Sequence, residues 1–198
     1  MTVLAINGSP RRGGNTETLL HAFLGGAEKV EVIRVVDLRI QPCIGCGGCD
    51  RNGECVLEDD MQEMHAKLLA ARRIVLASPI YFYGITAQAK ALVDRCQALW
   101  SRKRLMAERG EWRDDPDRQG YLLSVAASHG ARVFDGAMLT ARYAFDAIGV
   151  AYAGEFLARG IDARGRMAEE SELLARARRA GADFLAGGGR QSGMVLNK

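Results

Sequence analysis

Four cysteines crowd into one short stretch of the chain, Cys43, Cys46, Cys49 and Cys55, with the spacing C-x2-C-x2-C-x5-C. Glycines between them leave the backbone free to wrap around a bound group. The first three thiolates can hold three corners of a cube and the fourth can close it, which matches the ligation of a [4Fe–4S] cluster. Structural zinc sites more often use two separated pairs of ligands. The spacing leaves bare thiols, zinc and a redox disulfide as alternatives.

A second group of residues, 8–16 (Gly-Ser-Pro-Arg-Arg-Gly-Gly-Asn-Thr), joins a short apolar run to a segment with a helical pattern. Its glycines permit a tight turn and a close approach of the backbone to a ligand. The N–H groups at the start of the helix attract an anion, and one of the two arginines adds a full positive charge. The predicted phosphate-binding residues are Ser9, Arg11, Gly14, Asn15 and Thr16.

This loop differs from two other nucleotide-binding motifs. Gly8 and Gly13 have the spacing of the first two glycines of a P-loop, but Gly14-Asn15 stands where Lys-Ser or Lys-Thr is needed. The three-glycine dinucleotide fingerprint is also absent. The pattern therefore favours a ligand with one phosphate, and the simpler alternative is a plain strand-to-helix turn.

Three stretches carry a resemblance to a known family. They are the loop at 8–16, residues 78–84 (Ser-Pro-Ile-Tyr-Phe-Tyr-Gly) and residues 86–95 (Thr-Ala-Gln-Ala-Lys-Ala-Leu-Val-Asp-Arg). Together they resemble the NADPH-dependent FMN reductases and the related iron–sulfur flavoproteins, whose compact cysteine motif the spacing at 43–55 also resembles. The resemblance covers most of residues 1–100. It implies a flavodoxin-like fold, FMN as cofactor, and a homodimer or homotetramer in which a neighbouring subunit lies close to the flavin.

The residues after the third apolar run suit a flavin ring, which needs a flat wall and backbone donors at its pyrimidine edge. Three consecutive aromatic side chains can supply the wall, and N–H groups through Gly84 can supply the donors. Three aromatic residues in a strand-end loop cannot all point inward, which disfavours the alternative that they fill a core. The predicted ring-binding residues are Pro79, Ile80, Tyr81, Phe82, Tyr83 and Gly84, bordered by His129 and Gly130. No protein base is expected, because FMN itself carries the chemistry.

The elements that must position these loops alternate along the chain. Short apolar runs predict strands, and amphipathic segments with a helical repeat predict helices. The predicted strands are 3–6, 30–36, 74–77, 121–127 and 150–157, and the predicted helices are 16–25, 61–69, 86–100, 133–148 and 168–186. Glu31 and Arg34 place the second strand at an edge, since central parallel strands are apolar on both faces.

This alternation predicts an α/β fold with right-handed βαβ units. The sheet is expected to be doubly wound, five-stranded and parallel, in the order 2-1-3-4-5, with helices on both faces. Ligands bind such sheets beyond the carboxyl ends of the strands, where the strand order reverses. The loops after the first and third strands meet there, and we expect the cysteine loop after the second strand to lie beside them.

The chain is predicted to form one domain over residues 1–186. The charged segment 101–119 is interpreted as a lid, a subunit contact or a solvated surface excursion. The Gly-rich tail, 187–198, is predicted to be flexible.

Composition narrows the function classes. A formal net charge of +3 excludes a strongly basic nucleic-acid binder. No basic region precedes an apolar run at the start, and no apolar stretch is long enough to span a bilayer, so we expect a cytoplasmic protein without a membrane partner. In that compartment the cysteines are not a disulfide framework, and Cys96, in an apolar helical stripe, is predicted to be a core residue.

The prediction for function is an FMN-dependent oxidoreductase. It accepts a hydride from NAD(P)H and passes electrons to a small acceptor such as a quinone or, through the [4Fe–4S] cluster, to another carrier. The alternatives are a cluster-free NAD(P)H:FMN or quinone reductase and an iron–sulfur flavoprotein that carries electrons without a nicotinamide reaction. A more distant alternative is a thiol-based redox or metal sensor. No motif distinguishes NADH from NADPH.

Overall fold

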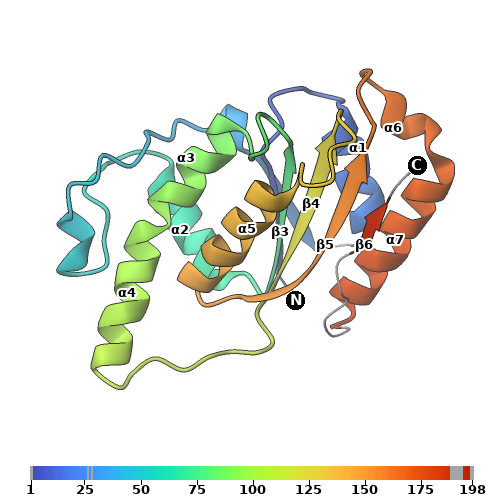
Figure 1. Cartoon of the computed structure of the whole chain (residues 1–198). Helices are drawn as coiled ribbons and strands as arrows, with labels where there is room; N and C mark the ends of the chain where they lie inside the picture. Colours follow the sequence, from blue (N-terminus) through green and yellow to red (C-terminus); the bar gives the residue numbers. More distant parts are fainter. Residues whose placement is uncertain (1, 26, 28, 188–193, 197–198) are drawn as a thin grey trace.

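The computed structural model describes residues 2–25, 27, 29–187 and 194–196 (Figure 1). Its centre is a parallel sheet in the order β2-β1-β3-β4-β5-β6. The strands are β1 Val3–Asn7, β2 Val30–Arg34, β3 Arg73–Pro79, β4 Gln119–Ala126, β5 Ala151–Arg159 and β6 Met194–Leu196. The first five stand in the predicted order, which confirms the doubly wound topology and the edge position of β2.

The end of the chain adds an edge strand that the alternating pattern does not predict. β6 pairs in parallel with β5, where Leu157 lies opposite Val195. The predicted flexible tail, 187–198, falls largely outside the described residues. No helix within the described ranges combines the length and the apolar character that a membrane crossing requires.

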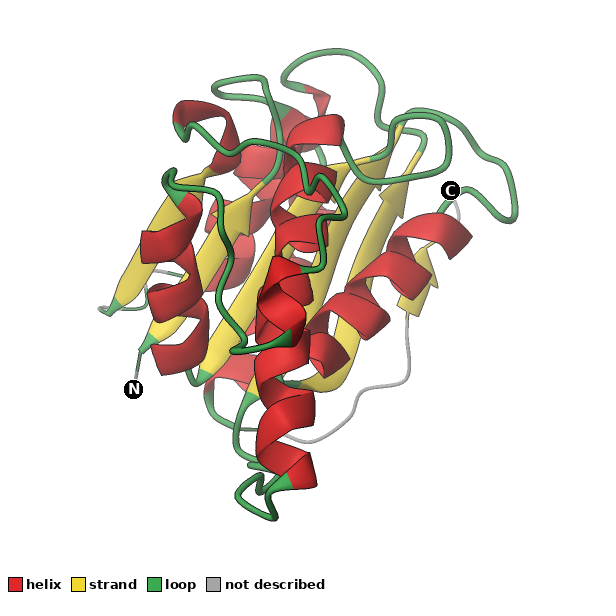
Figure 2. Ribbon diagram, turned by 90° about the vertical axis from the view of Figure 1, so that its left-hand side faces the viewer, coloured by secondary structure: helices red, strands yellow, loops and turns green. Residues whose placement is uncertain are grey.

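Helices cover both faces of the sheet (Figure 1, Figure 2). The helices are α1 Asn15–Leu24, α2 Met61–Ala70, α3 Ala87–Arg95, α4 Gln97–Glu108, α5 Asp135–Ala147, α6 Arg166–Glu169 and α7 Ser171–Leu185, with short 3-10 turns η1 Val35–Asp37 and η2 Gly48–Asp50. The apolar sides of α1, α6 and α7 form one core with the sheet. Those of α2, α3 and α5 form the other.

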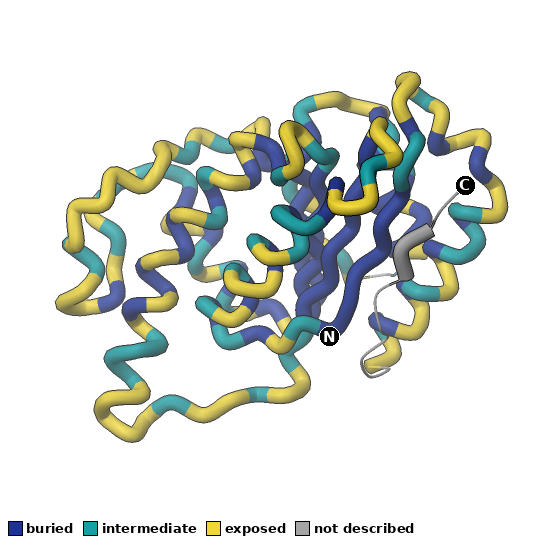
Figure 3. The backbone as a smooth tube through the Cα atoms, viewed as in Figure 1, coloured by how far each residue is buried: buried dark blue, intermediate teal, exposed yellow. Residues whose placement is uncertain are grey.

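The two cores explain why residues 3–6 of β1 and 74–77 of β3 are all apolar. In β1, Val3 and Ala5 face the α1 side, whereas Leu4 and Ile6 face the α2 and α3 side. All five residues of β1 are buried, as are nearly all of β3 (Figure 3). Burial on both faces is the general condition of parallel sheets, and it leaves only the loops at the strand ends to bind a ligand.

One predicted helix, 86–100, is two helices in the structure. The N–H of Cys96 donates to the carbonyl of Val93, a bond of the tight 3-10 type that separates α3 from α4. α4 then continues to Glu108, so the first part of the charged segment 101–119 is helical. The helical pattern is hard to see there because most residues after Trp100 are charged. The predicted helix 168–186 similarly divides into α6 and α7 at Glu170.

Helices α1 and α7 pack closely together at Gly181. A Cβ atom on this buried glycine would overlap the carbonyl group of Phe23 in α1. Glycine is therefore required by the closeness of a backbone, not by its own conformation.

Gly181→Ala is expected to destabilise the protein even though Ala is favoured over Gly in a helix by about 1 kcal/mol. The clash with α1 should outweigh that gain and lower the free energy of unfolding by about 1–3 kcal/mol. Urea unfolding measures the change. Ala182→Gly, at the next and exposed position of α7, is the control and should cost about 1 kcal/mol through helix propensity alone. A Gly181→Ala protein more stable than the wild type would contradict this packing.

Candidate functional site

The loop at 8–16 is held by contacts with the neighbouring strand and helix. The N–H of Gly8 donates to the carbonyl of Ala77 at 2.7 Å, and Oγ1 of Thr86 donates to the carbonyl of Gly8 at 2.7 Å. Thr86 also caps α3, because its Oγ1 accepts from the N–H of Ala89 at 3.2 Å. A Cβ atom on Gly8 would lie 2.7 Å from Cβ of Ala89. The loop after β1 is thus fixed against the start of α3.

The start of α1 faces the same region. Gly14 is its N-cap and supplies no side chain, so the first-turn N–H groups are available to an anion. The N–H of Gly13 is already engaged, because it donates to the Glu17 carboxylate at 2.6 Å. Of the two arginines in the loop, Arg12 forms an ion pair with Asp37 of η1 at 2.8 Å. Arg11 instead lines the cavity that the loop borders.

A cavity of about 120 Å³ collects the predicted residues of two loops. Its lining includes Ser9, Arg11, Gly14, Asn15, Thr16, Pro79, Ile80 and Tyr81. Every predicted phosphate-loop residue is therefore brought together with the beginning of the predicted ring-binding loop. The pairing of β1 with β3 is responsible, since it ends both strands side by side at the switch point.

The segment 160–167, which follows β5, also contributes to this cavity through Ile161 and Asp162. Sequence reasoning missed both residues, although the position after a strand on the same carboxyl edge is a usable signal. Asn15 holds the segment in place. Its Nδ2 donates to the carbonyl of Ala163 at 2.9 Å, and its Oδ1 accepts from the N–H of Met167 at 3.1 Å. The side chain of Asn15 therefore positions a wall of the cavity, rather than being a free phosphate donor.

The predicted ring-binding loop is a tight turn. The N–H of Tyr81 donates to the carbonyl of Gly84 at 2.9 Å, and the N–H of Gly84 donates back at 3.0 Å. Between them, Phe82 has φ 48° and Tyr83 has φ 65°. This is the left-handed backbone of a type I′ turn, normally formed by Gly, Asn or Asp. The N–H of Gly84, expected to serve the ligand, is engaged within the turn, whereas those of Phe82 and Tyr83 make no hydrogen bond to described residues.

The three aromatic side chains of this turn face outward. Tyr81, Phe82 and Tyr83 are 44%, 104% and 55% exposed, which agrees with the prediction that they do not fill a core. Left-handed backbone in a bulky residue costs about 1–2 kcal/mol, and such costs are concentrated in ligand clamps. An exposed, strained aromatic turn beside a cavity is a feature that folding alone does not require.

Of the two predicted residues after β4, Gly130 borders the aromatic turn and His129 lies against Gly160 at the end of β5. A Cβ atom on Gly130 would lie 3.0 Å from the Tyr83 hydroxyl, and one on Gly160 would overlap the exposed ring of His129. His129 and Gly130 thus lie on the same edge of the sheet as the aromatic turn. Phe82, Tyr83, Gly84, His129 and Gly130 are not in the lining of the cavity.

The four clustered cysteines line a separate cavity of about 230 Å³. Gly45 and Gly47, with φ 64° and 68°, turn the loop between them through backbone conformations that favour glycine. Within the described residues, no group of three or more His, Cys, Asp or Glu side chains converges closely enough for a single metal ion. A cubane cluster differs from a single ion, because it holds its thiolates at separate corners and needs a cavity edged by them. Cys96 lies apart and buried, as predicted, and burial raises the pKa of its thiol to about 12.

The position of the cysteine loop, residues 43–55, differs from the prediction. It does not lie beside the aromatic turn but extends outward over α3 and α4 (Figure 1, Figure 3). The two cavities have no lining residue in common. The physical reason is that the loop is anchored to α4: Ser101 Oγ donates to the Asp50 carboxylate at 3.1 Å, and Arg104 donates to the Asp50 carbonyl at 2.9 Å.

Phe82→Gly is expected to be more stable than Phe82→Ala by about 1 kcal/mol, because only glycine escapes the left-handed cost while its added chain entropy offsets part of the gain. Both variants remove the exposed ring, so the comparison isolates the backbone. Urea unfolding of the two proteins gives the difference. Equal stabilities would mean that the left-handed turn does not form in solution.

Comparison with known proteins identifies the family. A model of the NADPH-dependent FMN reductases matches residues 1–158. An iron–sulfur flavoprotein of Methanocaldococcus jannaschii is 42% identical over 103 residues, which are 50% of this chain and 53% of the relative. One of Archaeoglobus fulgidus is 39% identical over 99 residues, covering 48% and 45%. The chain thus spans about half the length of the curated relatives it matches.

Solved structures agree on the fold. The Trp repressor binding protein of Bacillus subtilis superimposes with a TM-score of 0.64 at 20% identity, covering 90% of this chain and 97% of that one. An NAD(P)H:quinone oxidoreductase of Methanothermobacter marburgensis gives a TM-score of 0.65 at 20% identity, covering 93% and 97%. Identity this low supports the architecture only. With the family match over most of the chain, the conclusion is that this chain belongs to the NADPH-dependent FMN reductase family.

Proposed function

We propose that the protein is an FMN-dependent oxidoreductase that accepts a hydride from NAD(P)H. The observation that supports this most strongly is the cavity in which an uncapped helix start and Arg11 meet Tyr81, the first residue of the aromatic turn. FMN has one phosphate and one flat ring system, so its two ends match the two ends of this site. The family, and the name of the structurally similar NAD(P)H:quinone oxidoreductase, point to the same chemistry.

The residues of the chain have distinct parts in this proposal. Ser9 and Thr16 offer hydroxyl donors to the phosphate, and Arg11 offers charge. Asn15 positions the segment 160–167. The aromatic turn provides the ring wall and the N–H donors of Phe82 and Tyr83, which no described residue engages. FMN, when bound, supplies the exchange between two-electron and one-electron chemistry.

We also propose that Cys43, Cys46, Cys49 and Cys55 hold a [4Fe–4S] cluster. The donor set fits, because four thiols edge one cavity and glycines allow the loop to wrap. Relatives with 42% and 39% identity are named iron–sulfur flavoproteins. Electrons then pass to a small acceptor or through the cluster to another carrier.

Assembly and location complete the proposal. Because the two cavities of one chain are separate, a homodimer or homotetramer in which a neighbouring subunit approaches the flavin is the arrangement that we favour. The cysteine-rich loop requires a reducing compartment, so we place the protein in the cytoplasm.

Anaerobically purified protein is expected to show flavin absorption bands with a broad additional absorbance that falls on reduction. Mixing with NADPH or NADH should bleach the flavin bands, because the bound ring accepts the hydride. If flavin and iron are present but neither nicotinamide bleaches them, the protein is an electron carrier instead, which the names of its relatives also suit. A colourless protein that takes up no added FMN contradicts the whole proposal.

Cys46→Ser is expected to remove iron while FMN remains bound, since the two cavities share no residue. Iron and flavin per chain are measured by colorimetric assay and absorbance. Cys96→Ala, which removes a buried thiol outside the loop, is the control and should keep both groups. Loss of FMN together with iron in Cys46→Ser would show that the cysteine loop is structural.

A further inference from the structure

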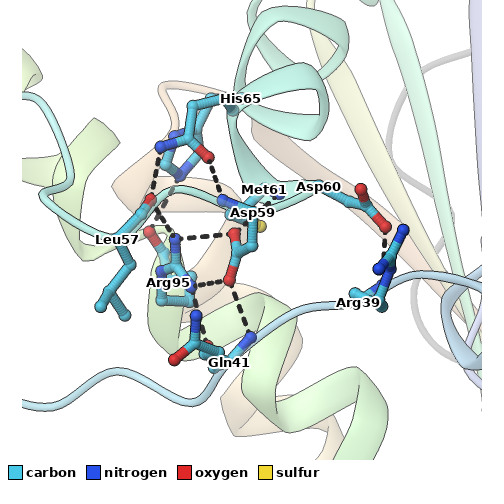
Figure 4. A network of polar contacts seen from close by, with 9 residues as sticks. Arg39, Gln41, Leu57, Asp59, Asp60, Met61, His65 and Arg95 are labelled. Atoms are coloured by element: carbon cyan, nitrogen blue, oxygen red, sulfur yellow. Dashed lines mark hydrogen bonds and ion pairs between the residues drawn. The ribbon is translucent and has the colours of Figure 1, made fainter.

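The cysteine cavity has one fully buried cation in its wall. The side chains of Arg95 and Asp59 are 0% and 5% exposed, and they form a two-point ion pair (Figure 4). Nη1 of Arg95 lies 2.7 Å from one carboxylate oxygen of Asp59, and Nη2 lies 3.0 Å from the other. Such paired contacts hold a guanidinium in a defined plane.

This pair fastens both ends of the cysteine loop. Arg95 donates to the carbonyl of Gln41 at 2.8 Å and to that of Leu57 at 3.3 Å. Asp59 accepts from the N–H of Gln41 at 2.8 Å. Gln41 precedes the loop and Leu57 follows it, so the base of the loop is closed on the end of α3.

The two charges of the pair stand differently toward the cavity. Arg95 belongs to its lining, together with Cys55 and the other cysteines, whereas Asp59 does not. Nε of Arg95 is buried and has no hydrogen-bond partner among the described residues. The cation therefore faces the site, and its counter-ion lies outside the lining.

Both groups of the pair are charged at neutral pH. Burial lowers the pKa of Arg95, but Asp59 and Cys55 raise it further than burial lowers it. Burial raises the pKa of Asp59, but the hydrogen bonds from Arg95, Gln41 and Met61 lower it further. Two other titratable groups lie near the pair. His65 contacts the carbonyl of Arg95, and burial lowers the pKa of its imidazole. Asp50 lines the cavity, and its carboxylate accepts a hydrogen bond from Ser101.

We propose that Arg95 raises the reduction potential of the cluster in this cavity and that Asp59 moderates the effect. The inference rests on the proposed function, in which the cysteines hold a [4Fe–4S] cluster and the flavin supplies the electron. A fixed positive charge favours the oxidation state with more negative charge, which is the reduced one. Net charge around the cluster is an established determinant of its potential. A buried ion pair contributes little to folding stability beyond its hydrogen bonds. Setting the reduction potential of the cluster is therefore a further role for this pair.

The test is a redox titration of the purified holoprotein, followed by electron paramagnetic resonance, with iron per chain measured in parallel. Arg95→Gln removes the cation, so the ratio of reduced to oxidised cluster at a fixed potential should fall at least tenfold. For a one-electron couple this corresponds to lowering the reduction potential by about 59 mV. Asp59→Asn leaves the cation uncompensated and should shift the potential the opposite way. Arg95→Lys keeps the charge and should stay near the wild type.

Opposite shifts of the reduction potential in the two variants distinguish an electrostatic effect from a structural one. Loosening of the loop would shift the potentials of Arg95→Gln and Asp59→Asn in the same direction, or would remove iron from both variants. If Arg95→Gln fails to fold, a raised potential in Asp59→Asn with an unshifted Arg95→Lys supports the proposal. An unshifted or lowered Asp59→Asn overturns it. Arg73→Gln is the control: it removes a buried arginine at the start of β3, outside the lining of the cysteine cavity, and should leave the reduction potential unchanged.

The wild type distinguishes the two proposals. If it holds no iron, the cluster assignment fails and the inference about Arg95 fails with it. If it holds iron but the reduction potentials of the variants equal that of the wild type, only the inference about Arg95 is overturned.

Discussion

The parallel pairing of β1 with β3 is the constraint on which the proposed flavin site depends. It sets Asn7 opposite Ala77, so the loops after both strands leave the sheet together. The N–H of Gly8 and the carbonyl of Gly8 are then tied to Ala77 and Thr86. No side chain can enter at Gly8, because Ala89 of α3 lies against it. The predicted phosphate loop and the first residue of the aromatic turn, Tyr81, which are distant in sequence, thereby line one cavity.

The cysteine site depends on a different constraint. It has no strand to define it, and its loop extends away from the sheet (Figure 1). Its geometry comes from one ion pair at the base, between Arg95 and Asp59, and from the contacts of Asp50 with α4. Arg95 ends α3, the helix whose other end is capped by Thr86 beside the predicted phosphate loop. One helix therefore connects the supports of the two sites without bringing their cavities together.

The backbone of the aromatic turn is where the protein accepts a local energetic cost at the proposed flavin site. Phe82 and Tyr83 adopt left-handed backbone that glycine would adopt more easily. Gly136 packs closely against Tyr83, since a Cβ atom on Gly136 would lie 2.5 Å from the Tyr83 carbonyl oxygen. The aromatic turn is thus held in its outward conformation by close packing beneath it, which is the arrangement that a rigid ring platform requires.

The sequence by itself determined the order of the first five strands, and it marked the glycine-rich loop after β1 and the clustered thiols as candidate sites. These features depend on local periodicity, on glycine in tight turns and on spacing within short segments, all of which are visible along the chain. Only the tertiary structure decided that Asn15 holds Ala163, that the Gly84 N–H closes its own turn, and that Arg95 faces the cysteines. It also moved the cysteine loop away from the position predicted beside the aromatic turn. Such roles arise from hydrogen bonds between distant segments, as between Asn15 and Met167, and the types of these residues carry no local signal of their partners.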